Sequence, residues 1–260
     1  MLTTHPRHAA ELADQALGEN CELVVAVGGD GTLNEVASQL VHTSATLGLI
    51  PCGSGDGLGR HLGIHGSVKH ALHVLGTGQP RLIDSGLADG HPFFTAAGVG
   101  FEAEVSTQFN RLTNRGFLRY LLTSERLWRL YVPEDYHIEQ RGERIAVRAF
   151  TLTVANSDQY GNRAFIAAGA KVDDGELNLT AVPPVTPWNG LGLLTRLFAG
   201  SLREGKGVIQ LHGDRFVVER SSAGPLHTDG EVHHAGTRIE FVVRPQSLRI
   251  MTPSRPAQTN

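Results

Sequence analysis

The stretch 27-VGGDGTLNEVASQL-40 follows directly on the apolar run 23-LVVAV-27 and places three glycines around one aspartate. Glycine adopts positive φ angles and lets a ligand approach the bare backbone, so such a corner can point several N–H groups at an anion. Leu33, Val36 and Leu40 recur at helical spacing, which predicts a helix whose amino end favours negative charge. An ordinary strand-to-helix turn needs one glycine, so we favour a phosphate site over a simple turn.

The first 80 residues alternate between helical and strand patterns. A helical pattern over 8–17 precedes the strand 23–27, and the helix after the glycine corner leads to the strand 46-TLGLIP-51 and the helix 67-SVKHALHVLG-76. This rhythm predicts a parallel sheet covered by helices. An α/β domain of this type normally begins with a strand, whereas this chain opens on a helical pattern, so we expect its first strand to be missing.

The pattern changes after 81-RLIDSGLADGHPFFTAAGVG-100. A helical, aromatic and basic segment extends from Glu102 to Tyr131 and is followed by short strands with turn signals between them, which predict an antiparallel sandwich. We therefore expect an α/β domain over 1–82, a β-sandwich domain over 83–250 and a disordered tail over 251–260. The expected strands are 136-YHIEQ-140, 145-IAVRAFTLTVAN-156, 176-ELNLTAVP-183, 215-RFVVER-220 and 237-TRIEFVV-243.

Composition narrows the function classes. Lysine and arginine total 23 against 26 aspartates and glutamates, a balance that argues against nucleic-acid binding through bulk charge. Cys21 and Cys52 stand beside apolar strands, where free thiols behave as small hydrophobes in a reducing cytosol. The start MLTTHPRHAA is unlike a signal peptide, and no apolar run reaches the roughly 18 residues of a membrane span. We expect a soluble, cytoplasmic protein whose substrate can still reside in a membrane.

A second glycine loop, 51-PCGSGDGLGRHLGI-64, repeats the arrangement of the first. Loops that follow neighbouring parallel strands lie side by side at the carboxyl edge of a sheet, where open α/β folds bind ligands. Ser54 has a hydroxyl that can donate to a phosphate or a ribose. Asp56 either caps the following helix or faces the substrate, and the residues alone leave both readings open.

A late turn, 225-PLHTDGEVH-233, carries two further acids. Seen alone, such a turn is usually only a hairpin. Phosphoryl transfer, however, needs carboxylates to hold Mg²⁺ and an acid that orients or deprotonates the attacking hydroxyl. Asp30, Asp229 and Glu231 can supply these groups across a cleft between the two domains.

Two other segments have both a functional and an ordinary reading. The loop 169-GAKVDDGELNL-179 is either a solvated turn or a structural cation site that uses Asp174 and nearby carbonyls. The run 111-RLTNRGFLRY-120 is either a solvated basic helix face or the source of Arg115 as a contact for a nucleotide phosphate.

Taken in order, these motifs resemble the diacylglycerol kinase catalytic-domain family, which includes the sphingosine kinases and the bacterial lipid kinases. They cover nearly the whole chain, from about residue 3 to about residue 250. GGDGT alone is shared with NAD kinases and phosphofructokinases, whereas the second glycine loop and the late turn narrow the choice. The matching segments are 28-GGDGTLNEV-36, 51-PCGSGDGLGRHLGI-64, 96-AAGVGFEAEV-105, 155-ANSDQYGN-162, 173-DDGELNL-179 and 228-TDGE-231.

The resemblance implies an ATP-dependent kinase that phosphorylates a lipid hydroxyl at a membrane surface, with a nucleotide-binding α/β domain and a lipid-binding β-sandwich. It implies Mg²⁺ at the late turn and a second Mg²⁺ at Asp174 with carbonyls near Leu177 and Leu179. We favour Glu231 or Asp229 as the base, with Asp30 organising Mg²⁺. The implied nucleotide contacts are Thr3, Gly28, Gly29, Asp30, Gly31, Thr32, Leu33, Asn34 and Ser54, to which we add Arg115.

Two departures from the family pattern bear on activity. Glu102 stands where the family has aspartate in its GFDA motif, and the opening strand with its Asn-Pro turn is absent. The missing strand leaves an unpaired sheet edge, from which we expect a homodimer. Two alternatives to a lipid kinase remain: an NAD kinase-like phosphotransferase, and a truncated, non-catalytic nucleotide- or lipid-binding protein.

Overall fold

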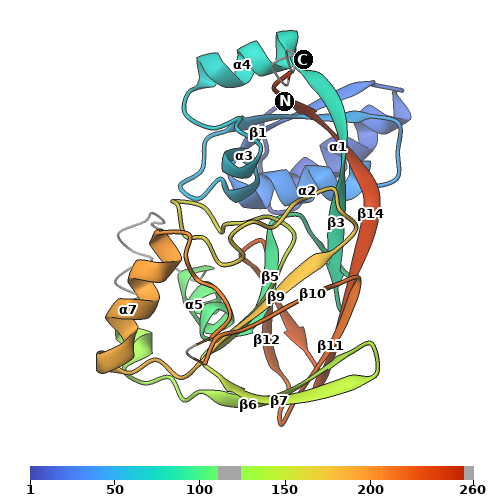
Figure 1. Ribbon diagram of the computed structural model, residues 1–260. Helices are drawn as coiled ribbons and strands as arrows, with labels where there is room; N and C mark the ends of the chain where they lie inside the picture. Colours follow the sequence, from blue (N-terminus) through green and yellow to red (C-terminus); the bar gives the residue numbers. More distant parts are fainter. Residues whose placement is uncertain (111–123, 206, 255–260) are drawn as a thin grey trace, which may run out of the picture.

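The computed structural model describes residues 1–110, 124–205 and 207–254. Figure 1 shows most of the helices gathered at one end of the molecule and a body built mainly of strands at the other. The helices are α1 (His8–Gly18), α2 (Asp30–Leu40), α3 (Gly57–His61), α4 (Val68–Thr77), α5 (Phe101–Asn110) and α7 (Pro187–Phe198).

The strands form two sheets, confirming the expectation of an α/β part joined to an antiparallel part. The first has the order β1-β2-β14-β11-β6-β7, with β3 beside β14 and β4 beside β3; the second has the order β10-β9-β8-β5-β12-β13. The strands are β1 (Leu23–Gly28), β2 (Thr46–Pro51), β3 (Gln79–Ala88), β4 (His91–Phe93), β5 (Ala96–Gly100), β6 (Glu134–Gln140), β7 (Glu143–Ala149), β8 (Thr151–Ala155), β9 (Leu177–Val182), β10 (Ile209–Gly213), β11 (Arg215–Arg220), β12 (Gly224–Thr228), β13 (Glu231–Ala235) and β14 (Arg238–Thr252).

The α/β part follows the predicted rhythm. β1 and β2 pair in parallel, and the apolar stripe of α2 is buried, with Leu33 and Leu40 in the core of this part. On the other sheet face, a Cβ added to Gly48 would stand 2.6 Å from Leu75 of α4 and 3.0 Å from Val25 of β1. Helices therefore cover both faces of the sheet, as a parallel arrangement requires.

The end of the chain completes the first sheet. β14 pairs along β3 in antiparallel fashion and reaches β2 in parallel, with Ile250 opposite Leu47. Figure 1 shows β3 and β14 as two long strands running between the helical end and the strand-rich body. The register shifts between Arg244 and Leu248, which is where the pair passes from one core to the other. The boundary near residue 82, which stays a prediction, falls within β3.

The sandwich encloses a core between the two facing sheets. The first sheet contributes Phe93, Tyr136, Phe216 and Phe241, and the second contributes Leu152, Leu179 and Leu226. One strand prediction was wrong. The run 145–156 reads as a single strand, but it divides at Phe150 into β7 of the first sheet and β8 of the second. Because of this division, one apolar run contributes a strand to each of the two sheets.

β1 lies at the end of its sheet, and among the described residues it pairs with β2 alone. Leu23, Val25 and Val27 are exposed along it, Val27 to 58%. Alternate residues share one face of a strand, so this edge presents an apolar strip as well as unpaired N–H and C=O groups.

Candidate functional site

The two glycine loops meet at one edge of the sheet. β1 ends at Gly28 and α2 begins at Asp30, so Gly29 alone makes the turn. The parallel register sets Gly28 opposite Pro51, and the N–H of Cys52 donates to the Gly28 carbonyl at 2.8 Å. The predicted juxtaposition of the loops follows from this register.

Glycine occurs at different positions of these loops for different physical reasons. A Cβ on Gly53 would stand 2.6 Å from the Cα of Gly29, so the two loops touch through bare backbone. At Gly31, in contrast, an added Cβ would meet nothing within 4 Å. Gly31 is exposed in the first turn of α2. Internal packing explains glycine at 29 and 53, whereas glycine at 31 leaves room for a ligand at the amino end of the helix.

Asp30 joins the two loops through its carboxylate. Its Oδ2 accepts the N–H of Asp56 and its Oδ1 accepts the N–H of Gly57, each at 2.9 Å. Burial raises the pKa of the Asp30 carboxyl to about 6, and the negative charge of Asp229 adds to the rise. The two N–H bonds oppose the rise, so a cation beside Asp30 would relieve the cost of its charge.

Asp229 is held much more completely. Its Oδ2 accepts from the Asn34 amide at 2.8 Å and from the Phe94 N–H at 2.9 Å. Its Oδ1 accepts from the N–H groups of Thr95 and Ala96 at 2.9 and 3.1 Å. Burial raises the pKa of the Asp229 carboxyl, and these four donors act in the opposite direction. Asp229 thereby ties the β12–β13 turn to the start of β5 and to α2.

The contact between Asn34 and Asp229 links the first motif of the chain to the last. Asn34 is buried on α2 and also donates to the Pro92 carbonyl at 3.0 Å. Glu231, the first residue of β13, is exposed. The structure therefore combines a firmly anchored Asp229 with a solvent-facing Glu231 two residues later.

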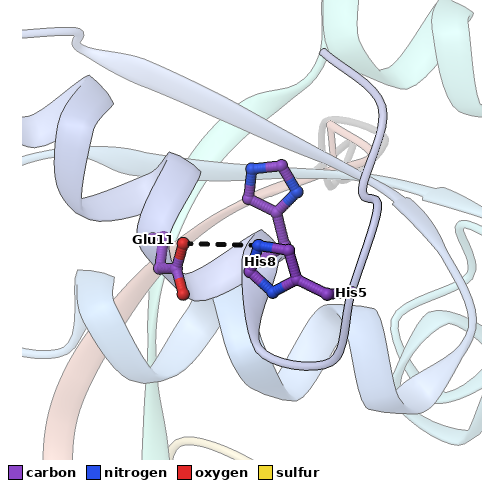
Figure 2. Close-up of side chains that lie close together, drawn as sticks. All are labelled: His5, His8 and Glu11. Atoms are coloured by element: carbon purple, nitrogen blue, oxygen red, sulfur yellow. Dashed lines mark ion pairs between the residues drawn. The ribbon is translucent and has the colours of Figure 1, made fainter.

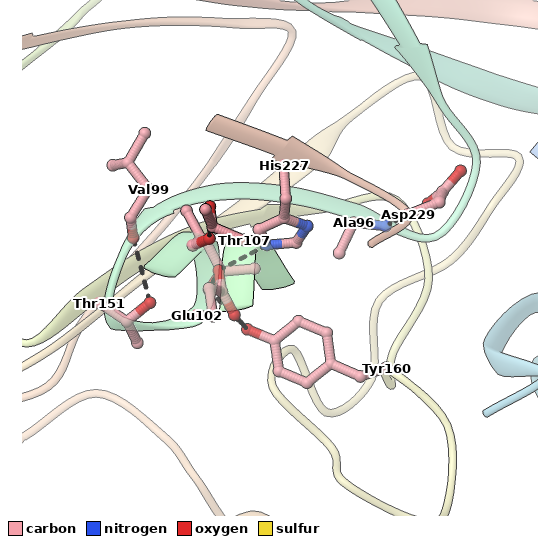
Figure 3. Close-up of polar contacts among 10 residues, drawn as sticks. Ala96, Val99, Glu102, Thr107, Thr151, Tyr160, His227 and Asp229 are labelled. Carbon is pink, nitrogen blue, oxygen red and sulfur yellow. Dashed lines mark hydrogen bonds and ion pairs between the residues drawn. The ribbon is translucent and has the colours of Figure 1, made fainter. Parts of the chain in front are cut away.

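A buried polar cluster lies beside the late turn, and the sequence analysis gave it no role (Figure 3). Glu102 accepts from Thr153 Oγ1 at 2.6 Å and from the Tyr160 hydroxyl. His227 is buried, with its Nε2 3.1 Å from Glu102 Oε1. A Cβ on Gly98 would stand 2.1 Å from the same oxygen, which explains the glycine in the GVGFEA segment. That segment, with Tyr160 in 155-ANSDQYGN-162, was the available signal.

The predicted second cation site lies on a different loop. Asp174 is exposed, and its Oδ1 accepts the N–H of Glu176 at 3.2 Å. Leu177 and Leu179 lie in β9 with buried side chains, so only their carbonyls can act as ligands. Asp174 and Leu179 line a cavity of about 240 Å³ whose wall also includes Lys171. A lysine in that wall disfavours a cation.

The loop around Asp174 is anchored by Asp84, which sequence reasoning missed. Asp84 is fully buried in β3, and its oxygens accept the N–H groups of Gly175 and Gln246 at 2.8 and 2.7 Å. Burial raises the pKa of the Asp84 carboxyl, and the charges of Asp174 and Asp173 add to the rise. Nothing local in the segment 81-RLIDSGLADG-90 marks this role.

The other predicted contacts are spread around the first loop. Thr3 is exposed before α1, whose start is tied to α2 because Glu35 accepts the N–H of Ala9 at 3.1 Å. Thr32 is half-buried and Leu33 is buried in the core, so Leu33 can offer a ligand only its backbone. Ser54 is exposed in the second loop. Arg115 lies outside the described residues.

His5, His8 and Glu11 bring three possible ligand atoms within 4.8 Å of one another. Figure 2 shows the three side chains close together. The two imidazoles are stacked, with centroids 4.4 Å apart and planes inclined by 10°. The lone pair of an imidazole nitrogen lies in the ring plane, so two stacked rings do not direct lone pairs at one ion. The Nδ1 of His8 also accepts the N–H of Thr4 at 3.0 Å. We assign no metal to this cluster.

No other group of three histidine, cysteine or acidic side chains is so compact in the part of the chain that the structure describes. Asp30, Asp229 and Glu231 therefore do not form a closed metal cage. Mg²⁺ is usually held by one or two carboxylates together with substrate phosphates and water. Asp30 fits that pattern, since each of its oxygens accepts a single N–H bond and a carboxylate has about four acceptor positions.

Comparisons with known proteins agree with this arrangement of motifs. Residues 1–88 match the family described as "Diacylglycerol kinase catalytic domain", and residues 95–252 match "YegS C-terminal NAD kinase beta sandwich-like domain". A Pseudomonas aeruginosa protein named "Probable lipid kinase YegS-like" is 31% identical over 95% of this chain and 82% of its own length. An uncharacterised Synechocystis protein is 31% identical over 92% of this chain, which spans only 57% of that relative.

A solved structure from Bacillus anthracis resembles this one with a TM-score of 0.79, covering 99% of this chain and 86% of its own. The two sequences are 20% identical, so this likeness concerns the fold. It confirms the combination of an α/β part and a β-sandwich in one chain.

Proposed function

The chain belongs to the diacylglycerol kinase catalytic-domain family, and from that premise we propose that it transfers the γ-phosphoryl group of ATP to a lipid hydroxyl. The proposed acceptor is a diacylglycerol or a sphingoid base. The observation that carries the proposal is the junction at Asp30. One carboxylate there binds the N–H groups of Asp56 and Gly57 and lies close enough to Asp229 for their charges to interact.

That junction brings together what phosphoryl transfer needs, because the reaction depends on positioning and charge stabilisation more than on covalent chemistry. The amino ends of α2 and α3 lie side by side. The first N–H groups of α3 already donate to Asp30, whereas the amino end of α2 offers N–H groups to an anion, and Gly31 leaves open space there. The proposed nucleotide contacts are Thr3, Gly28 to Asn34, Ser54 and Arg115, with Leu33 contributing only its backbone.

We assign Mg²⁺ to Asp30 together with the phosphates of ATP. When bound, the ion would neutralise charge that builds up on the transferred phosphoryl group. The second Mg²⁺, at Asp174 with the carbonyls of Leu177 and Leu179, stays a weaker proposal because Lys171 lines the same cavity.

Glu231 is the proposed base for the lipid hydroxyl. A base must be free to accept a proton, and all the oxygen contacts of Asp229 described above serve to anchor the turn. Glu231 is exposed and follows Asp229 by two residues, so the anchoring of Asp229 positions it. This assignment gives the two acids of the late turn separate tasks.

A lipid acceptor places the proposed reaction at a membrane surface, on its cytoplasmic side, where ATP is available. In the described residues, no helix is both long and apolar enough to cross a bilayer. A homodimer through the β1 edge also stays a prediction, supported by the exposed side chains of Leu23, Val25 and Val27. Static light scattering of wild type against Val27→Lys tests it, because a charge on an edge strand discourages pairing.

The substrate class is tested with radiolabelled ATP and separate acceptors: diacylglycerol, sphingosine, NAD and a total lipid extract. Phosphorylation of diacylglycerol or sphingosine supports the proposal. Labelling of NAD alone would indicate the NAD kinase-like alternative. Binding of ATP without labelling of any acceptor would indicate a non-catalytic nucleotide-binding protein.

The phosphate site itself is tested by Gly31→Ala, compared with Gly76→Ala in α4. Both glycines are exposed in helices, and a Cβ at either would meet nothing within 4 Å. Alanine in a helix raises stability by about 0.5–1 kcal/mol at such positions. We expect both variants to gain stability, but only Gly31→Ala to lose ATP affinity, by at least about 10-fold. Equal ATP affinity in calorimetry would overturn the phosphate site.

A further inference from the structure

Helix α7 exposes a row of large apolar side chains to solvent. Trp188 is 95% exposed, Leu191 72%, Leu194 51% and Phe198 41%. Their spacings of three, three and four residues place them within an arc of about 120°, at roughly 100° per residue. We call these four residues the α7 face.

The opposite side of α7 is fixed to the protein. Leu193 and Leu197 pack against a core cluster that includes Ala96, Ala155 and Ile166. The start of the helix is fixed by reciprocal bonds, because the Thr186 N–H donates to Asn189 Oδ1 at 2.8 Å and the Asn189 N–H donates to Thr186 Oγ1 at 3.3 Å. The α7 face is therefore the outer surface of a docked helix rather than an inner surface that packing has left open.

Helix α7 carries one charged side chain, Arg196, and no acid, although the whole chain has a formal net charge of −3. In the segment after the helix, Arg203 directly precedes Glu204. Arg203 is exposed. A row of leucines with tryptophan and phenylalanine, flanked by arginine, is the composition of helices that lie in the interface of a membrane containing anionic lipid.

The helix is also connected to the candidate site. The N–H of Phe165 donates to the Leu197 carbonyl at 3.0 Å, and the N–H of Tyr160 donates to the Ala164 carbonyl at 3.1 Å. The next residue, Gly161, forms a bridge with Asp56 of the second glycine loop. Figure 1 shows α7 on the flank of the strand-rich body, outside both sheets. A surface that held α7 would thus hold the loop beside the proposed phosphate site.

We propose that the α7 face docks the protein on the surface of a bilayer that contains anionic lipids. The inference rests on the proposed function, since a lipid acceptor must be met at such a surface. Trp188, Leu191, Leu194 and Phe198 lie among the acyl chains just below the headgroups. Arg203, which is exposed just beyond the helix, faces the lipid phosphates. Arg196 instead holds the end of the helix, because its guanidinium donates to the Arg203 carbonyl at 2.7 Å. A tryptophan at this depth places its ring in the apolar region and its N–H among polar headgroups.

Docking is tested by sedimentation of the intact protein with vesicles of phosphatidylcholine mixed with phosphatidylglycerol. Leu194→Glu is compared with Leu72→Glu, because Leu72 of α4 is 54% exposed against 51% for Leu194. The two variants carry the same change of charge on equally exposed helix positions. We expect Leu194→Glu to lower the vesicle partition coefficient at least about 10-fold and Leu72→Glu to leave it nearly unchanged. Equal partition coefficients for the two variants would refute the docking surface.

Fluorescence reports whether α7 itself enters the interface. The chain has two tryptophans, so Trp128→Phe leaves Trp188 as the sole emitter. We expect a blue shift on addition of the mixed vesicles and quenching by brominated lipid. Sedimentation with vesicles without any change in emission would show that another surface binds the membrane and would overturn the inference.

Activity and oligomeric state separate the remaining possibilities. We expect Leu194→Glu to lower the ratio of phosphorylation of vesicle-borne diacylglycerol to that of a dispersed short-chain diacylglycerol. If neither form is phosphorylated by wild type, the proposed function fails, while sedimentation and fluorescence still decide the docking. A wild-type dimer that Leu194→Glu converts to a monomer would make the α7 face an interface between copies and would contradict membrane docking.

Discussion

Asp30 and Asp229 occupy similar settings in the sequence, each beside glycine in a turn next to a strand, but the structure uses their carboxylates differently. Each oxygen of Asp30 accepts one main-chain N–H, from Asp56 or Gly57. The oxygens of Asp229 together accept four hydrogen bonds, from the Asn34 amide and three successive N–H groups beginning at Phe94. The first acid retains acceptor capacity, whereas the second has used its capacity within the fold.

This difference assigns separate roles to the carboxylates of Asp30 and Asp229, which the motifs alone do not distinguish. A carboxylate with spare acceptor positions can take a cation, while one whose acceptor positions are filled by neutral donors serves to hold the fold together. The late turn can then act through Glu231, which is exposed. Each prediction below changes one member of this set and asks whether activity or stability responds.

The largest expected effect is on turnover in Asp30→Asn. Asparagine keeps the shape of the side chain and removes the charge that Mg²⁺ needs. Removing one group that stabilises the charge of a transition state typically costs about 10²–10³-fold in turnover, and we expect a loss in that range. Asp14→Asn, the same change at an exposed position of α1, serves as the control. Near wild-type kinase activity in Asp30→Asn would remove Asp30 from the mechanism.

Asp229→Ala is expected to act first on stability. The variant leaves the Asn34 amide and the N–H groups of Phe94, Thr95 and Ala96 without their acceptor. Unsatisfied buried donors cost about 1–3 kcal/mol each before relaxation and water entry, so we expect a loss of about 3–4 kcal/mol in the free energy of unfolding. Urea unfolding measures it. A loss below about 1 kcal/mol in the free energy of unfolding would show that Asp229 does not anchor the late turn. Asp229 would then again be a candidate base.

Much of the fold follows from local patterns. The apolar run 23–27, the alternation around 46–51 and the helical spacing of 67–76 each specify an element without help from distant residues, and the structure contains all three. The closing of the first sheet by β14 has no such signal, because Ile250 pairs with Leu47 across about two hundred residues of chain. Division of the run 145–156 between two sheets likewise depends on which layer each half meets.

The candidate site likewise contains residues that local sequence patterns mark and residues that they do not. Glycine-rich turns mark Asp30, Asp229 and Glu231 in the sequence, because the composition of these turns is unusual for an ordinary turn. No local sequence pattern marks Asp84. It is fully buried, and its carboxylate accepts the N–H groups of Gly175 and Gln246, which are distant in the sequence. Glu102 differs from its neighbours in the sequence only as a departure from a family pattern, and its partner His227 reads as one more strand residue.

Glu231→Gln tests whether Glu231, rather than the anchored Asp229, acts as the base of the late turn. A base acts in the transition state rather than in nucleotide binding. We therefore expect kcat to fall about 100-fold while the Kd for ATP changes less than about 2-fold, with Glu139→Gln on exposed β6 as the control. Steady-state kinetics and calorimetry give the two numbers. Parallel loss of both would make Glu231 a nucleotide or metal contact instead of the base.

The smallest expected effect is the pH dependence of stability due to Asp30, measured without metal or nucleotide. Its pKa rises from 3.8 to about 6 on folding. A carboxyl with a raised folded pKa binds more protons in the folded state between these values, so its contribution to the free energy of unfolding falls as pH rises through this range. About one unit above pH 6 the loss is complete.

Because an asparagine side chain does not titrate, the difference in unfolding free energy between wild type and Asp30→Asn isolates this contribution. That difference should fall by about 1–2 kcal/mol between pH 4 and pH 6.5, the full shift being reduced for partial exposure. In an Asp229→Asn background the fall should be smaller, since the charge of Asp229 is the second cause of the raised pKa. A pH-independent difference would mean that the N–H groups of Asp56 and Gly57 satisfy the charge of Asp30 fully, and the distinction between a reactive acid and a structural one would be lost.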